Sequence, residues 1–469
     1  MASSGATHIT VDKTNTGLLH LPQTDDAAFK VSELLQKDME RHHTFFNASG
    51  FHNHIVHHLL ALFSTGASVP SLEQAFRENS AYQLPSSQPN PSIVSTLSSS
   101  SATQPPTEYL GKGTNYSSLL AYFKSELSRL GSIQKTLEEH VFSGSPRAED
   151  MMLRLHAGVF HPLIHMMYGI EFSLPSIVAQ ALAQAAVHKT NQLGDFFASS
   201  ESMALSRSRS NTGAKMGPIR SLYEQIRSNE KLATAAKFED DQKIDGVLSR
   251  AGDEILDIVA KVKIDESELE GKVLEMYDNA LYMAFGSAGW MKGKKEKVDF
   301  FFMHHANSSP FYVSLLPSVS SSSTSPSPAS SLPDSIKVRL LEWKLRLDLL
   351  QYAARGAPSL SLSYLSSYAP VSSKDAFEKL HFLKDDGHTV KLARAVEIYR
   401  HVVAEGKKVS FKSNFSEEGE GKGIDDIWGR IMAMIVDSTS RDGEQKWVRS
   451  AGMEGAWKGV PDKDEGGEK

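Results

Sequence analysis

Histidine is concentrated in one short apolar segment near the N-terminus. The stretch FHNHIVHHLLAL, residues 51–62, carries four histidines among its first eight positions. In an α-helix, residues four apart lie on the same face, so His54 and His58 are expected to point the same way, with His57 about 60° around the helix. Imidazole nitrogens are good ligands for first-row transition metals. This spacing therefore predicts one half of a metal site.

A second pair of histidines has the same spacing. The stretch GVFHPLIHMMYGIEF places His161 and His165 four residues apart in another apolar segment. Two such helices facing each other can bring four imidazoles to one point, which is a common way for a helical bundle to bind a metal. The predicted ligands are therefore His54, His58, His161 and His165.

Two later segments supply further candidates for catalysis or metal binding. DFFFMHHANSSPF places His304 directly after a very apolar run, and LKDDGHTVKLARA places His388 one helical turn before Lys391. We include His304, His388 and Lys391 among the candidate catalytic residues.

These residues also have other interpretations. A buried histidine is often an ordinary core residue, but burying four imidazoles without partners would cost a few kcal/mol each, which favours a metal. Two Glu-x-x-His spacings, Glu40 to His43 and Glu378 to His381, resemble those of di-iron bundles but lie in charged neighbourhoods. The motifs HExxH, GxSxG, the P-loop and a GxGxxG after a strand are absent, so no nucleophile or nucleotide site is indicated.

The composition limits the protein class. The chain has 469 residues, 40% hydrophobic and 23% charged, which is typical of a globular protein with a large core. A net charge of -6 gives no reason to expect nucleic acid or an anionic membrane as a partner. The absence of cysteine excludes disulfides and thiolate ligands. Without a signal peptide or a long apolar run, the protein is expected to be cytoplasmic.

The elements that must carry these residues are mostly helices. Apolar residues recur with helical spacing in several segments, such as 28–46, 172–188 and 336–356, and KVDFFFM is the main strand candidate. We therefore predict a mainly α fold, a large bundle-like single domain. The predicted divisions are a flexible N-terminus (1–20), one helical domain (21–458) with mobile Ser-rich or Ser/Pro-rich surface insertions (about 84–107, 199–217 and 317–335), and a disordered tail (459–469).

The order of these segments resembles that of the questin oxidase-like family of fungi, whose members act on anthraquinones of aromatic polyketide pathways. The likeness covers about residues 20–440 without the Ser-rich insertions. It rests on five segments in the same order: FHNHIVHHLLALFSTGAS, FHPLIHMMYGIEFSLPSIVAQALAQAAVH, FFMHHANSSPF, LEWKLRLDLLQYAARGAPSL and DDGHTVKLARA.

The resemblance implies an oxidase that uses NADPH and opens an anthraquinone ring by a Baeyer–Villiger-type reaction. At least one member is similar to an iron-dependent dioxygenase with several histidine ligands and a carboxylated lysine. Carried over, this implies non-heme iron at the two His-x-x-x-His segments and carboxylation of Lys391, with Lys344 as the alternative. Burial favours the neutral amine that carboxylation requires. The chain has no dinucleotide fingerprint, so NADPH is implied by the resemblance alone.

A flat substrate needs an apolar slot, and aromatic residues flank the histidine segments. The candidates for its walls are Phe51, Phe160, Tyr168, Phe172, Phe302, Phe311 and Trp343. Arg355 could orient a phenolate, although an exposed arginine at a helix end is the simpler interpretation. Two other function classes fit the same histidines: a zinc-dependent hydrolase, and a non-catalytic helical binding protein.

Overall fold

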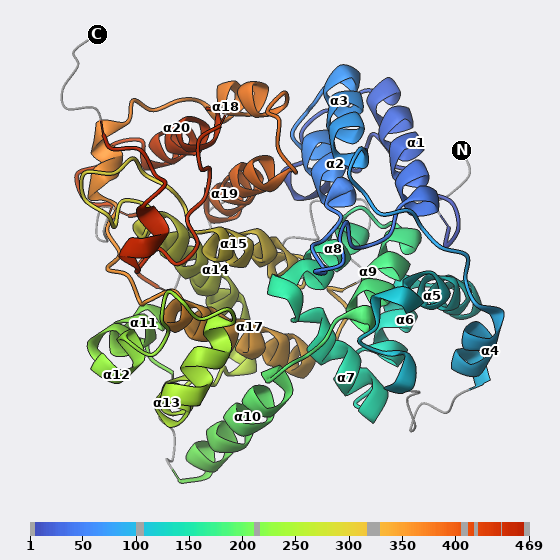
Figure 1. Cartoon of the computed structure of the whole chain (residues 1–469), viewed down its shortest axis with the longest axis horizontal. Helices are drawn as coiled ribbons and strands as arrows, with labels where there is room; N and C mark the ends of the chain where they lie inside the picture. The colour runs from blue at the N-terminus through green and yellow to red at the C-terminus, as the bar shows by residue number, and fades with distance from the viewer. Residues whose placement is uncertain are drawn as a thin grey trace. The chain divides into compact units, whose positions relative to one another are not determined.

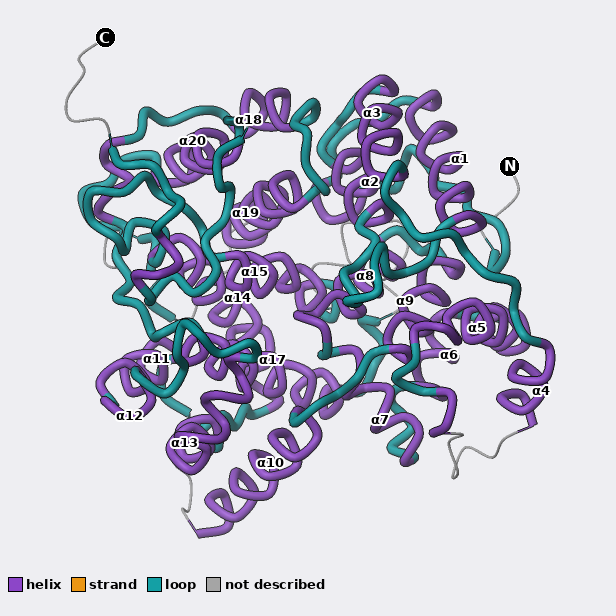
Figure 2. Tube along the Cα trace, in the orientation of Figure 1, coloured by secondary structure: helices purple, strands orange, loops and turns teal. Residues whose placement is uncertain are grey.

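The computed structural model describes residues 5–99, 107–210, 216–316, 329–404, 411–416, 421–441 and 443–463. These residues form helices joined by loops, and they contain isolated β-bridges but no β-strand (Figures 1 and 2). The predicted mainly α fold is confirmed. The strand candidate KVDFFFM instead leads into helix α15, which begins at Phe300.

The chain divides into two compact units, each assembled from separate stretches. Unit 1 comprises Met1–Leu193, Pro310–Ile336 and Phe377–Arg394. Unit 2 comprises Gly194–Ser309, Lys337–Ala376 and Ala395–Lys469. The start of helix α19 therefore belongs to unit 1. The predicted boundaries of a single helical domain, 21–458, stay a prediction.

The helices of unit 1 include all of the elements that carry the first histidine segments. They are α1 (Asp25–Arg41), α2 (Ile55–Ser64), α3 (Val69–Ser80), α4 (Pro91–Ser99), α5 (Tyr116–Leu130), α6 (Ile133–His140), α7 (Pro146–Leu155), α8 (His161–Glu171), α9 (Pro175–Val187), the end of α18 (Ser373–Leu380) and the start of α19 (His388–Ala404).

Unit 2 contains the remaining helices, some of them in large part. They are α10 (Leu193–Ser210), α11 (Ile219–Ser228), α12 (Glu230–Ala233), α13 (Lys243–Val259), α14 (Leu269–Gly286), α15 (Phe300–Val313), α17 (Asp334–Ala354) and α20 (Ile427–Thr439). None of the described helices is both long enough and apolar enough to cross a membrane.

Two predominantly apolar helices that are buried on nearly every side lie in the core of unit 1. Helix α2 is buried along its whole length and packs on α1, α3 and α8. Helix α9, with the alanine-rich sequence PSIVAQALAQAAV, packs on α5, α7 and α8. A helix without a polar face is stable only when other elements surround it. This packing brings α2 against α8, the two helices that carry the predicted histidine pairs.

Residues 9–11 are packed against α1 within the predicted flexible terminus over 1–20, of which residues 1–4 lie outside the described residues. Ile9 and Val11 are buried. The Ile9 amide donates to Gln36 Oε1 (3.0 Å), and the Val11 amide donates to Ser32 Oγ (2.8 Å). Two apolar side chains two residues apart point to the same side of an extended segment, which lets this short stretch cover a helix.

The predicted insertions differ in part from the structure. Within 84–107, residues 91–99 form helix α4, whose buried Leu97 anchors a helix that packs on α5. Within 199–217, residues up to Ser210 belong to α10, because Phe197, Ser200 and Ala204 recur with helical spacing and are buried. Of the third insertion and the tail, residues 317–328 and 464–469 lie outside the described residues.

A buried ion pair connects four segments of unit 1. The Glu171 carboxylate at the end of α8 contacts the Arg394 guanidinium on α19, and both side chains are almost fully buried. Glu171 Oε1 also accepts from the Leu18 amide (2.7 Å), and Arg394 Nε donates to Ser64 Oγ on α2 (2.7 Å). The pair thus connects α2, α8 and α19, the three helices whose N-termini carry His54, His161 and His388.

We predict that Glu171→Gln lowers the free energy of unfolding by about 3 kcal/mol, because it leaves the buried Arg394 charge without its counterion. Chemical denaturation followed by circular dichroism measures this change. The control is Glu33→Gln, which removes a carboxylate from partly exposed pairs with Lys30 and Lys37 and should change stability little. Equal effects of the two substitutions would contradict the role given to the buried pair.

Candidate metal centre

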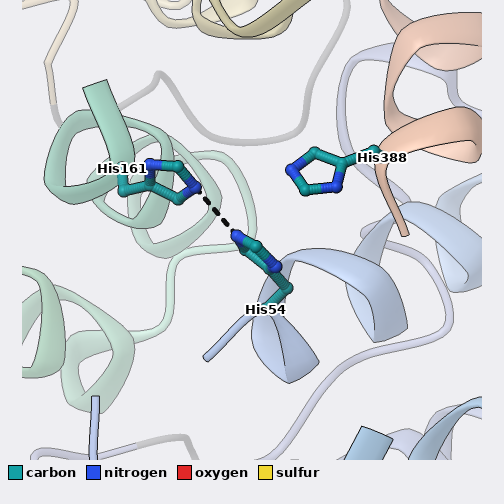
Figure 3. A group of neighbouring side chains, drawn as sticks. All are labelled: His54, His161 and His388. Carbon is teal, nitrogen blue, oxygen red and sulfur yellow. Dashed lines mark hydrogen bonds between the residues drawn. The ribbon is translucent and has the colours of Figure 1, made fainter. Parts of the chain in front are cut away.

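Three histidines from three helices meet at one buried point. They are His54, directly before α2, His161, the first residue of α8, and His388, the first residue of α19. One nitrogen of each ring lies within 4.8 Å of the others, and all three side chains are buried. Figure 3 shows the three rings turned toward one another. The Nε2 atoms of His54 and His161 are 2.8 Å apart.

Helix α2 begins where a side chain caps it. Asn53 Oδ1 accepts from the Ile55 amide (2.9 Å), and Asn53 Nδ2 donates to Asp38 Oδ1 on α1 (2.8 Å). This cap satisfies an amide that the helix leaves without a partner and ties the start of α2 to α1. His54 is therefore fixed just outside the helix.

The backbone before α8 is strained. Gly158, Val159 and Phe160 all have positive φ (56°, 56° and 63°). A β-branched residue such as valine is very rarely found in this left-handed region, and such strain is concentrated at functional sites. This run places the Gly158 carbonyl oxygen 2.6 Å from His161 Nδ1, so it sets the orientation of the His161 ring.

A tight turn of sequence DDGH precedes α19. The two carboxylate oxygens of Asp385 accept from the amides of Gly387 (2.6 Å) and Thr389 (3.0 Å), which caps the helix. Asp386, the next residue, contacts two rings of the cluster: its Oδ1 lies 2.5 Å from His388 Nδ1 and its Oδ2 lies 3.1 Å from His54 Nδ1.

These contacts determine where the protons of the three rings lie. A carboxylate or a carbonyl oxygen only accepts, so the Nδ1 atoms of His54, His161 and His388 each carry hydrogen. A neutral imidazole then has its lone pair on Nε2. Neutral His54 and His161 therefore direct lone pairs at each other across 2.8 Å, which is repulsive unless a cation is present.

Protonation of His54 is a poor way to supply that cation. Desolvation, followed by the charges of Lys391 and His388, lowers the pKa of His54 to about 3. A transition metal fits better, because two imidazoles in adjacent octahedral positions with bonds of about 2.1 Å have nitrogens about 3 Å apart. The residues present therefore fit a metal ion bound by His54, His161 and His388.

A second histidine pair lies beside the first. His57 Nε2 and His165 Nδ1 are 3.2 Å apart, and the Tyr168 ring stacks on His57. Desolvation lowers the pKa of His165 to about 3 and that of His57 well below its usual value. His57 Nδ1 and His165 Nε2 have no hydrogen-bond partner among the described residues, so these nitrogens are also available to a ligand.

Lys391 is buried one turn into α19, and its Nζ has no hydrogen-bond partner within the described part of the chain. Desolvation lowers its pKa to about 8. The Lys391 charge is the second-largest cause, after desolvation, of the lowered pKa values of His54 and His57. Lys391 therefore lies close enough to influence both histidine pairs.

His58, a predicted ligand, faces another direction. Its Nδ1 accepts from Asn79 Nδ2 on α3 (3.3 Å), and its Nε2 is 4.0 Å from Asp385 Oδ1. His304 belongs to unit 2, where its Nδ1 donates to the Phe300 carbonyl oxygen (2.6 Å). Lys344, the alternative to Lys391, is also in unit 2 and forms a fully buried ion pair with Asp348.

Several residues of the cluster were not among the predicted site residues. Asp386 could have been found as a carboxylate two positions before His388. His52 stacks on His161 with ring centroids 3.8 Å apart, and its Nε2 lies 2.6 Å from His188 Nε2. Neither His52 nor His188 has a sequence spacing that predicts this contact.

The predicted aromatic slot is only partly assembled around the cluster. Tyr168 and Phe172 stack on each other next to His57, and Phe160 precedes α8. Phe51 is 44% exposed. Of the other candidates, Phe311 belongs to the second stretch of unit 1, and Phe302 and Trp343 belong to unit 2. Arg355, interpreted as an exposed helix-end residue, is buried in unit 2 against the Phe301 ring, 3.6 Å from its centroid.

Comparison with known proteins identifies the family. The sequence model described as questin oxidase-like matches residues 51–396. The chain belongs to the questin oxidase-like family. A Baeyer–Villiger oxidase of Pestalotiopsis fici is 32% identical over 98% of this chain and 100% of the relative. A Baeyer–Villiger oxidase of Emericella nidulans is 34% identical (91% and 92%), and a questin oxidase of Aspergillus fumigatus is 33% identical (93% and 94%).

Membership of the questin oxidase-like family confirms the resemblance seen in the sequence and identifies an oxidoreductase. The hydrolase and the non-catalytic binding protein are therefore set aside. The matched residues 51–396 contain all three histidines of the cluster and Lys391.

We predict that Gly387→Ala destabilises the protein more than Gly66→Ala. Both glycines have φ of +86°, so both substitutions incur backbone strain. A Cβ at Gly387 would lie 2.6 Å from His58 atoms, whereas Gly66 has nothing within 4 Å. The difference in unfolding free energy between the two variants, measured by chemical denaturation, reports the close packing of the DDGH turn on α2. A larger loss for Gly66→Ala would contradict this packing.

Proposed function

We propose that this chain opens the quinone ring of an anthraquinone by Baeyer–Villiger-type oxidation with O2, in the cytoplasm, at a non-heme iron site. The proposed protein ligands are His54, His161 and His388, together with an oxygen of carboxylated Lys391. Compared with the sequence-based ligand set, His388 takes the place of His58, and His165 lies in the adjacent pair. The names of the relatives support the reaction.

The observation that carries the proposal is the convergence of the Nε2 lone pairs of His54, His161 and His388 on one buried point. Each Nδ1 already has an acceptor. Because an uncompensated arrangement of this kind is repulsive, a cation is the group that stabilises it. Nitrogen ligands with one anionic oxygen and open positions suit iron that reacts with O2.

The electrostatics at Lys391 favour its carboxylation. The three histidines stand at the N-termini of α2, α8 and α19, where the partial charge of a helix is positive. An ammonium group is destabilised near such ends, and an anion is stabilised. Attack of the neutral Nζ on CO2 forms an N–C bond and releases the amine proton to water, which converts Lys391 into an anionic oxygen donor.

The chain's own residues would orient the reaction. When bound, iron supplies the activation of O2. Asp386 and the Gly158 carbonyl hold the three Nδ1 protons and so keep each Nε2 directed inward. The stacked rings of Tyr168 and Phe172 supply apolar surface near His57, which excludes water and suits a flat aromatic substrate.

The electron and proton balance of the reaction defines what NADPH would supply. Insertion of one oxygen atom beside the quinone carbonyl, with the other oxygen leaving as water, consumes two electrons and two protons. A hydride from NADPH and one proton provide these, and hydrolysis of the resulting ester opens the ring. NADPH is proposed from the family resemblance, because no Rossmann-type site is formed by the described residues, which contain no strand.

We predict that the protein reconstituted with iron(II) consumes O2 when an anthraquinone and NADPH are added, and that His161→Ala reduces this rate at least 100-fold by removing a ligand. Oxygen-electrode and product mass measurements check this. His401→Ala, on the same helix as His388 but exposed, serves as the control. If the wild type binds no iron and gains no activity from it, the metal-dependent reaction is wrong.

We predict that Lys391→Met retains the fold but binds iron(II) one to two orders of magnitude more weakly, because methionine fills the space without an anionic oxygen. Calorimetric titration measures the affinity. In wild type supplied with 13C-bicarbonate, the carbamate carbon should give an NMR signal that the variant lacks.

The matched variant for this test is Lys344→Met, which removes a buried lysine that is paired with Asp348 in unit 2. It should leave the iron affinity and the carbamate signal unchanged, although its stability will fall. If Lys344→Met loses the iron affinity and the carbamate signal while Lys391→Met keeps them, the oxygen donor is Lys344.

A further inference from the structure

We propose that Asp386 is the positioning residue of this centre: its two carboxylate oxygens hold His54 and His388 in the single tautomer that presents both Nε2 atoms to one ion. The inference rests on the proposed metal site and assigns a role to a residue that contacts neither the ion nor the substrate in it. Asp386 acts through the two rings.

The geometry is that of one carboxylate shared between two ligands. Asp386 Oδ1 lies 2.5 Å from His388 Nδ1, and Asp386 Oδ2 lies 3.1 Å from His54 Nδ1. The ring planes of His54 and His388 are inclined by 70°, with centroids 4.5 Å apart. One planar carboxylate therefore sets the angle between two ligands that come from segments 334 positions apart in the chain.

Asp385, the adjacent residue, has a different task. Its oxygens accept from the Gly387 and Thr389 amides, so they cap α19. Its Oδ1 also lies 4.0 Å from Nε2 of His58. The two aspartates thus carry the same charge one residue apart, but only Asp386 bridges two rings of the cluster. Substitution of Asp385 therefore removes the same charge, together with part of the α19 cap, without removing a contact to a ring of the cluster.

The chemistry of the side chain makes the role testable. A carboxylate accepts two hydrogen bonds, whereas an amide of the same shape accepts with its oxygen and donates with its nitrogen. In Asp386→Asn, the ring that faces the amide nitrogen must accept at Nδ1. Its hydrogen then moves to Nε2, and one of the three lone pairs directed at the ion is lost.

The location of Asp386 allows this substitution without loss of the core. Its side chain is 33% exposed, whereas the three rings are buried. It stands in a turn before α19 rather than inside a helix. An isosteric amide there creates no cavity, so the metal-free fold is expected to be retained.

The test uses Co2+ as a probe with an absorption spectrum that depends on its ligands. Asp386→Asn should bind Co2+ about 10- to 100-fold more weakly than wild type, which is the usual effect of removing a hydrogen-bond partner of a metal ligand. It should also change the visible spectrum of the bound ion. Asp386→Glu, which keeps the carboxylate, should recover part of the affinity. Asp385→Asn, which removes the same charge and weakens the cap of α19, should leave the visible spectrum of bound Co2+ unchanged, because it alters the tautomer of no ring in the cluster. Thermal unfolding of each metal-free variant checks that the fold is present.

The outcomes separate the two claims. If wild type binds Co2+ and Asp386→Asn binds it equally well with the same spectrum, or if both Asn variants change the spectrum in the same way, the positioning role is overturned while the metal site stands. If wild type binds neither Co2+ nor Fe2+, the metal site itself is overturned, and this inference with it. If Asp386→Asn does not fold, the positioning role is tested with Asp386→Glu. A wild-type spectrum of Co2+ bound to Asp386→Glu supports the role of the carboxylate. Loss of Co2+ binding by a folded Asp386→Glu overturns it.

Discussion

Mutual repulsion of imidazole lone pairs is the constraint on which this site depends. Nδ1 of His54, His161 and His388 is committed to Asp386 or to the Gly158 carbonyl, so each neutral ring can offer only Nε2 to the others. At 2.8 Å, two such nitrogens do not attract each other. Burial also disfavours protonation of these rings, since it lowers the pKa of His54 to about 3. A bound cation converts this repulsion into coordination.

Local structures around the cluster hold the three rings in place despite the repulsion between their lone pairs. The Asn53 cap fixes the start of α2, the left-handed run before α8 orients His161, and the DDGH turn begins α19. The Glu171–Arg394 pair joins α8 and α19 within the same unit. The burial of helices such as α2 and α9 offsets the cost of this strain and of the buried charges.

The position of the histidines at helix N-termini has a consequence for the chemistry. The positive ends of three helices lower the basicity of the rings and favour anions nearby. The carboxylated Lys391 that we propose would satisfy that preference and would complete a ligand set of nitrogen and anionic oxygen. In a family of oxidases that includes questin oxidases, the same field would also stabilise a phenolate on an aromatic substrate.

The fold class and the family of this protein could be predicted from local patterns in its sequence. Helical periodicity and the lack of strand signals predicted the mainly α fold, and the apolar surroundings of His54 and His161 marked them as buried polar residues. The order of the motifs also indicated the family. These properties depend on residues close together in the chain, which is why a single sequence carries them.

Tertiary structure decided which histidines meet. The rule that residues four apart share a face requires both to be inside one helix, but His54 precedes α2, so it turns to His161 while His58 turns to Asn79. His388 reaches the cluster because α19 begins at a turn that packs on α2. The bridge made by Asp386 joins segments far apart in the chain, and no spacing within a segment encodes such a contact. Helix packing, rather than periodicity, therefore determined the site.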